Sequence, residues 1–298
     1  MWRLALLAGA LVAGTAAAPM PALDRLIEAD ARLQTIGWRL ARGNAPFCAE
    51  TRPATGLLLM DAANFRDPAA IRAALGLTGD IAVNAVAQGS PAQRAGLKPG
   101  EGVVALAGQA MAALPPAAAQ DPFRLAGLHD RLDRELAITG TVTLQLADRA
   151  VTISAEPACA ARFAIGPAGQ KPVSGDGRVI LGQADAEAGE GHAAAIAAHE
   201  LAHVILRHTT RGASFATIRA QEQAADRLAP WLLANAGYDP AAMLRLAEGR
   251  GDGLIAPATH GSWRHRARAI RAELAAVAAA GPPPLDWRSR FAPPAQMR

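Results

Sequence analysis

The chain has 298 residues, of which 51% are hydrophobic and 19% charged, so it can bury a core and form one or two domains. Its formal net charge is +4 and its pI is about 9.8, but apart from a short basic stretch at 263–268 the charge is spread along the chain. Only 4% of the residues are aromatic, so we expect no stacking platform and no nucleic-acid partner. Abundant alanine predicts mainly helices.

Residues 1–18 are predicted to be a secretory signal peptide. Arg3 precedes an apolar run at 4–13, and small residues follow at 14–18. The apolar run is too short to span a bilayer, and no later segment approaches that length. We therefore expect an exported chain, periplasmic or otherwise extracytoplasmic, with no transmembrane span in the mature protein.

Residues 19–60 are predicted to hold an N-terminal helix and the lead-in to the main domain. Apolar residues recur at helical spacing over 23–40, and charged residues occupy the other face. This pattern is typical of a surface helix that packs on a larger domain. We expect no chemistry from it.

The chain contains two cysteines, Cys48 and Cys159. In an exported protein such a pair favours a disulfide, although two free buried thiols are the alternative. A closed loop of this length would stabilise the fold by roughly 4–5 kcal/mol in the chain-entropy model. We expect the bridge to form at the base of the segment that lies between the two cysteines.

Residues 61–157 are predicted to form a separate β-rich unit. The expected elements are strands at 81–86, 102–108, 142–146 and 151–154 and a helix at 123–136. Together with the Gly-Ser-Pro-Ala segment at 89–97, this order resembles a PDZ domain of exported proteases. The resemblance implies an inserted domain that binds an extended peptide at a sheet edge, with its groove-forming loop near 75–79. A PDZ-like spacer that binds no ligand is the alternative.

Residues 158–280 contain the motif that carries chemistry, His-Glu-x-x-His at 199–203 in a run of helix formers. Positions i and i+4 lie on one face of a helix, so His199 and His203 can direct two imidazoles at one metal ion. Glu200 can then reach a water bound to that metal as a general base. The alternative is a chance motif with two buried histidines that have other partners.

A second predicted helix, at 218–236, supplies the acidic residues that a zinc site needs. Glu222 and Asp226 are i and i+4 and share one face of it. One of them can bind zinc while the other orients a ligand imidazole. A solvated acidic face is the alternative for the pair.

These motifs together resemble the HtpX/BepA-type zinc metallopeptidases, which are gluzincins related to the CAAX prenyl endopeptidases. The resemblance rests on His-Glu-Leu-Ala-His at 199–203, Glu-x-x-Ala-Asp at 222–226 and Asn-Ala-Gly-Tyr-Asp-Pro at 235–240. It implies one zinc ion per chain, held by His199, His203 and Glu222. Asp226 would orient one of the imidazoles.

The resemblance extends to Thr-His-Gly-Ser at 259–262 and to Arg266, and it covers about 160–275. It implies that His260 or Arg266 stabilises the oxyanion, or that His260 caps the zinc in a resting state. It also implies an edge strand along the cleft, which we assign to 179–181. Gly261 replaces the proline usual in the family, and the link to Glu222 is short, which suggests a more open cleft.

The predicted fold class is α+β: a mainly helical zincin-type metallopeptidase domain with a small edge sheet, plus the inserted PDZ-like domain. A last helix is expected at 262–280, and residues 281–298 are expected to be a tail on the surface or disordered. The predicted function is a zinc endopeptidase that cleaves misfolded or unassembled envelope proteins in protein quality control. The alternatives are a PDZ-based chaperone or adaptor without hydrolysis, and a zinc esterase or amidase.

Overall fold

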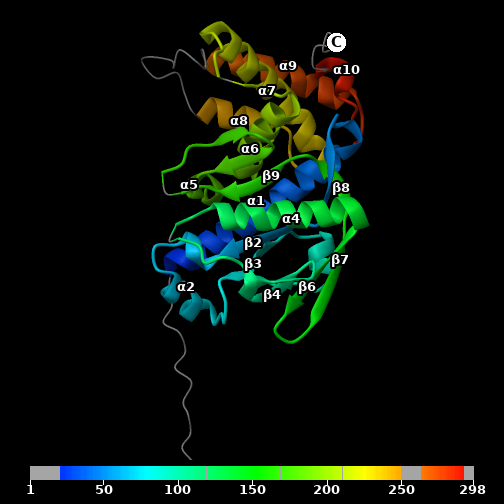
Figure 1. Ribbon diagram of the computed structural model, residues 1–298. Coiled ribbons are helices and arrows are strands. Elements are labelled where there is room, and N and C mark those ends of the chain that lie inside the picture. The colour runs from blue at the N-terminus through cyan, green and yellow to red at the C-terminus, as the bar shows by residue number, and fades with distance from the viewer. Residues whose placement is uncertain (1–20, 119, 168, 210, 250–262, 292–298) are drawn as a thin grey trace, which may run out of the picture.

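The computed structural model describes residues 21–118, 120–167, 169–209, 211–249 and 263–291 (Figure 1). Over this part of the chain the fold is α+β, with several small sheets, as the sequence predicted. The assignment of zincin-type and PDZ-like domains stays a prediction. No helix within these ranges is long and apolar enough to cross a membrane. The predicted signal peptide lies outside the described residues.

Helix α1 (Pro21–Asn44) occupies the centre of the molecule, so the prediction of a surface helix is wrong. It packs against α6 and β9 in the helical part and against β3 in the β-rich part. Six consecutive residues at 33–38 are buried, which a helix achieves only when it is covered on several sides. Polar Gln34 and Thr35 lie in this stretch and find partners, the former on Phe163 and the latter on Ala31 and Gln88.

Two glycines let α1 approach its neighbours closely. A Cβ atom on Gly37 would lie 2.3 Å from the ring of Phe163, and one on Gly43 would lie 2.3 Å from the backbone oxygen of Asn235. Both distances are far shorter than a van der Waals contact. The absence of a side chain at these positions therefore sets how close α1 lies to β9 and to the end of α7.

The β-rich part has its own hydrophobic core, in the lower half of Figure 1. Its elements are β2 (Leu57–Asp61), α2 (Pro68–Leu75), β3 (Ile81–Val86), α3 (Pro91–Arg94), β4 (Val103–Leu106), β5 (Gln109–Ala110), α4 (Phe123–Thr139), β6 (Thr141–Leu146) and β7 (Ala150–Ser154). The strands form a β2–β3 pair and a β5–β4–β6–β7 sheet, which one bridge between Ala82 and Gly102 connects. The elements expected over this stretch are thus present.

The two ends of the β-rich part lie side by side. Strand β1 (Thr51–Ala54) leads into it, and β8 (Glu156–Cys159) leads out and pairs antiparallel with β1. Just before β1, Cys48 forms the predicted disulfide with Cys159, with a Cα–Cα distance of 5.6 Å. The intervening segment therefore starts and ends at one place on the helical part.

The helical part contains the second main core, in the upper half of Figure 1. Its elements are β9 (Arg162–Ile165), β10 (Val173–Gly175), β11 (Arg178–Leu181), α5 (Gln183–Glu187), α6 (Glu190–Ile205), α7 (Phe215–Asn235), α8 (Ala242–Gly249), α9 (Trp263–Ala279) and α10 (Arg288–Phe291).

The order of the strands in the small sheet of the helical part is β10–β11–β9. The strand at 179–181 is therefore central, because β11 is paired on both sides. β10, added by the turn at 176–177, forms one edge, which corrects the edge-strand prediction.

The segment after α9 is packed in the core rather than lying as a loose tail. Buried Asn44 accepts hydrogen bonds from Asn235 Nδ2 (2.9 Å) and Trp287 Nε1 (3.0 Å), and Asn235 also bonds both backbone groups of Leu285. Phe291 is buried too. The expectation of a surface or disordered tail is thus wrong for 285–291, because Leu285, Trp287 and Phe291 are buried in the core, whereas 281–284 are exposed. Residues 292–298 lie outside the described part.

Candidate metal centre

Helices α6 and α7 lie against each other and carry the predicted ligands. Residues 193–198 of α6 are all buried and mostly alanine, which lets neighbouring helices approach closely on several sides. His199 and His203 follow one turn apart on the side that faces α7. Helix α7 begins after Ser214, which caps it by accepting a hydrogen bond from Thr217 N.

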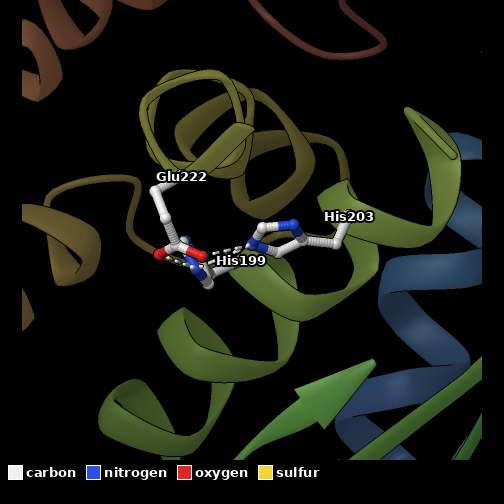
Figure 2. A group of neighbouring side chains, drawn as sticks. All are labelled: His199, His203 and Glu222. Atoms are coloured by element: carbon white, nitrogen blue, oxygen red, sulfur yellow. Dashed lines mark hydrogen bonds and ion pairs between the residues drawn. The ribbon is translucent and has the colours of Figure 1, made fainter. Parts of the chain in front are cut away.

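Three ligand atoms converge between these helices (Figure 2). Nε2 of His199 lies 3.2 Å from Nε2 of His203, and the Glu222 carboxylate oxygens lie 3.5 Å and 3.4 Å from these two nitrogens. A tetrahedral zinc ion with bonds of about 2.0–2.2 Å separates its donor atoms by about 3.3–3.5 Å. The 3.5 Å and 3.4 Å contacts reach different oxygens of Glu222, and one donor atom from each of the three residues lies within 4.8 Å of the others. Two imidazoles and a carboxylate are ligand types that suit zinc.

Asp226 and Arg266 support this group from behind. The Asp226 carboxylate is fully buried. Its Oδ1 lies 3.1 Å from Nδ1 of His199 and accepts a hydrogen bond from Nη2 of Arg266, while its Oδ2 pairs with Nε of Arg266. This arrangement fixes the His199 ring so that Nε2 faces the site. It matches the predicted position of Asp226, one turn beyond Glu222.

The guanidinium of Arg266 forms ion pairs with the carboxylates of Asp226 and Glu222. Besides Asp226, it lies 3.6 Å from Glu222 and stacks 4.1 Å from the ring centroid of Trp263. Only 4% of this residue is exposed. Contact with a substrate oxyanion stays a prediction that this buried geometry does not favour. The other predicted oxyanion residue, His260, lies outside the described residues, as does the whole 259–262 motif.

Glu200 follows His199 on α6 and contacts the small sheet. Its Oε2 accepts a hydrogen bond of 2.7 Å from the hydroxyl of Ser174, which lies on the edge strand β10. The carboxylate is nearly buried, with 9% of the residue exposed. No sequence pattern indicates a role for Ser174, because it lies in a turn-rich stretch whose pairing depends on the tertiary fold.

His208 is a further member of the site that the sequence analysis did not assign. Its Nδ1 lies 2.9 Å from Nδ1 of His203, the ring nitrogen that faces away from Glu222. The contact depends on the end of α6, where Arg207 adopts a left-handed conformation (φ 54°) and His208 N donates to His203 O. His208 lies five residues after His203 and beyond the end of α6, so helical periodicity does not predict that the two rings meet.

The protein groups alone favour one positive charge on the imidazole pair. Burial opposes the charge on His199, but hydrogen bonds to Asp226 and Glu222 outweigh it and raise its pKa to about 10. Burial and the nearby charge of His199 lower the pKa of His203 to about 3. A cation that binds here displaces the proton, which couples metal affinity to pH.

The site thus defines a class by its chemistry: two histidines and one carboxylate that converge from two helices, with a second carboxylate beside them. No protein-family model, no curated protein and no solved structure significantly matches this chain. Arguments about function therefore rest on the geometry of the residues themselves.

Proposed function

We infer that this protein is a zinc-dependent endopeptidase. The observation that carries the inference is the convergence of His199, His203 and Glu222, which each offer one donor atom within 4.8 Å of the other two. Three protein ligands are the number typical of catalytic zinc sites, since structural sites use four. Glu200 lies next to His199 on α6, where a general base for hydrolysis is required.

A zinc ion held by these residues supplies Lewis-acid polarisation of a carbonyl and lowers the pKa of water to about 7. Glu200 accepts the proton of the attacking water and passes it to the leaving amine. Asp226 keeps the His199 ring in its ligand orientation, and Arg266 keeps Asp226 ionised: although burial raises the pKa of Asp226, hydrogen bonds from Arg266 and His199 lower it overall.

The edge strand favours a polypeptide substrate over a small ester or amide. β10 pairs with β11 on one side only, and it packs against α6 near Glu200. Within the described ranges no strand pairs with the other side of β10, so its backbone groups there can pair with an extended chain, as in β-strand addition. Because such pairing requires an unfolded segment, we propose unfolded or unassembled proteins as substrates.

Export is part of the same proposal. The bridge between Cys48 and Cys159 fits an oxidising compartment such as the periplasm, because cytosolic thiols are kept reduced. Envelope proteins that have not assembled would then be the substrates within reach. Expression with and without residues 1–18, followed by fractionation, tests this location.

The decisive experiment compares wild type with Glu200→Gln. We expect both proteins to hold about one zinc per chain by mass spectrometry, and the variant to cleave casein at least ~100-fold more slowly. Glu187→Gln, an exposed change on α5, is the matched control and should keep wild-type turnover.

Two outcomes would contradict the proposal. Equal casein cleavage by wild type and Glu200→Gln would show that Glu200 is not the general base. Zinc binding in Glu222→Ala as tight as in wild type would show that Glu222 is not the third ligand. A wild type that binds zinc and peptides but never cleaves them would favour the adaptor alternative.

A further inference from the structure

The contact between Ser174 and Glu200 places a polar side chain of the edge strand on the proposed general base. The Ser174 hydroxyl donates to Oε2 at 2.7 Å, so the two carboxylate oxygens are no longer equivalent. A carboxylate without this bond can rotate about its last side-chain torsion, because such torsions are broad. The hydroxyl therefore selects one orientation of Glu200.

The strand that carries Ser174 is held by β11. In the antiparallel register Ser174 pairs with Val179, and in the parallel register Val179 pairs with Phe163 on β9. Val179 belongs to the core that includes α6, whereas the next residue, Ile180, points to the opposite face of the sheet. A shift of β11 therefore moves Ser174 relative to α6.

Strands β9 and β11 border a cavity of about 300 Å³ with residues of both faces, Val179 and Ile180 among them. Helix α4 forms the other wall with Leu125, Ala126 and His129, and α1, β1 and β2 close the sides. Its volume and mainly apolar lining are within the range of small-ligand pockets. The two strands thus contact both this cavity and the core that includes α6.

Polar atoms of residues around the cavity lack partners in the described structure. These buried atoms are Nε of Arg52, Oδ1 of Asn64 and Nε2 of His129. Burial lowers the pKa of His129 to about 4, so its ring is neutral and Nε2 is free to accept a hydrogen bond. Arg52 and Arg162 both pair with Asp133, which ties α4 to β1 and β9. Helix α4, which forms one wall of the cavity, is therefore held by ion pairs at Asp133. The three buried polar atoms around the cavity could bind a ligand.

We propose that Ser174 is a positioning residue for Glu200, and that the sheet makes this contact respond to the filling of the cavity behind it. The positioning role rests on the proposed peptidase function. The mechanical link from α4 through β11 to β10 does not, so the two are tested separately.

The first test removes the hydroxyl. Ser174→Ala should lower kcat roughly 3- to 10-fold with unchanged KM, which corresponds to one hydrogen bond. Ser174→Thr, which keeps the hydroxyl, should restore most of the rate. Ser154→Ala, an exposed change on β7, is the control. A wild-type kcat in Ser174→Ala, or failure of threonine to restore the rate, would overturn the positioning role.

The second test fills the cavity with a side chain, so that no ligand is needed. Ala126→Phe projects into it from α4, and Ala137→Phe on the exposed side of the same helix is the matched control. Amide hydrogen exchange over 171–181 should change at least severalfold in the first variant and remain unchanged in the second. Ala126→Leu replaces Ala126→Phe if the larger side chain prevents folding.

A double-mutant cycle joins the two tests. If the link runs through Ser174, the effect of Ala126→Phe on kcat should disappear in the Ser174→Ala background. Independent effects that multiply, or unchanged exchange at β10, would overturn the link. An inactive wild type would refute the peptidase, whereas the exchange measurement would still decide whether the sheet transmits the change.

Discussion

The carboxylate of Asp226 shows how one buried residue orders a whole site. It is fully buried between His199 and Arg266: Arg266 donates to both of its oxygens, and Nδ1 of His199 lies 3.1 Å from Oδ1. A buried carboxylate is tolerated only with such partners, because leaving a charge unpaired in the interior costs several kcal/mol. The ligand ring and the guanidinium are therefore fixed together.

Asp226→Asn should weaken zinc binding about 10- to 100-fold, because the amide no longer stabilises the ligand orientation of His199. Competition with a chromophoric chelator measures the change. Asp185→Asn, on α5 with His192 as its partner at 3.8 Å, is the matched control and should bind zinc as wild type does. Wild-type affinity in Asp226→Asn would show that the carboxylate has no role in the site.

Residues on one helical face were predictable from spacing alone. His199 with His203, and Glu222 with Asp226, are each four apart within one helix, so local geometry fixes their common direction. Ser174 depends on the turn that returns β10 to the sheet. His208 depends on the left-handed Arg207, and neither conformation has a periodic signature in the sequence.

Helix α1 is the element on which close packing depends most. Gly43→Ala should destabilise the protein by about 1–3 kcal/mol, because its Cβ would lie 2.3 Å from a backbone oxygen that cannot move alone. Gly127→Ala on α4 is the control, since nothing lies within 4 Å of its Cβ position. That variant should gain about 0.5–1 kcal/mol from helix propensity. Urea unfolding of both variants measures the difference, and equal stabilities would contradict the packing argument.

Asp30 on α1 joins the two parts of the molecule and gives their junction a pH dependence. It accepts hydrogen bonds from Asn84 on β3 and from Ile165 N on β9. Burial raises its pKa to about 6, and these two bonds only partly oppose the shift. Since the folded pKa lies above the unfolded value of 3.8, its contribution to stability is full below pH 3.8 and is lost as the pH rises through 6.

Asp30→Asn should therefore remove this dependence. Relative to the variant, wild type should lose up to about 3 kcal/mol of unfolding free energy between pH 4 and pH 7. Denaturant unfolding of both proteins at several pH values measures the difference. Parallel stability curves would show that Asp30 keeps an ordinary pKa in the folded protein.

Most elements followed from their residue patterns, and the exceptions have tertiary causes. Strands such as β6 and β7 alternate in burial, and helix α7 has a clear start at Ser214. The central place of α1 was not predictable, because charged residues on one side of it indicate a surface helix and the partners of its buried Gln34 and Thr35 include distant segments. The edge position of β10 depends on strand order, which no local pattern encodes.

At the scale of the whole molecule, the disulfide closes the base of the β-rich part. Cys48 and Cys159 are 111 positions apart in sequence. The double variant Cys48→Ser, Cys159→Ser should lose up to about 4–5 kcal/mol of stability in the chain-entropy model. It should still bind zinc, because the ligands lie on α6 and α7.

Thermal unfolding with and without a reducing agent checks this prediction. Reduced wild type should melt at the same temperature as the double variant, and both should melt below oxidised wild type. A double variant as stable as oxidised wild type would show that the pairing of β1 with β8 alone holds the base together.

The hydrogen bond from Trp287 to Asn44 spans 243 positions of the chain, and the bond from Asn44 to Leu232 spans 188. Helix α1 is synthesised before both partner segments, so its buried Asn44 gains these hydrogen bonds only after residues 232 and 287 have been made. Contacts of such high sequence separation slow folding. A chain that folds late can still be passed through a membrane pore in extended form, which is compatible with the proposed export.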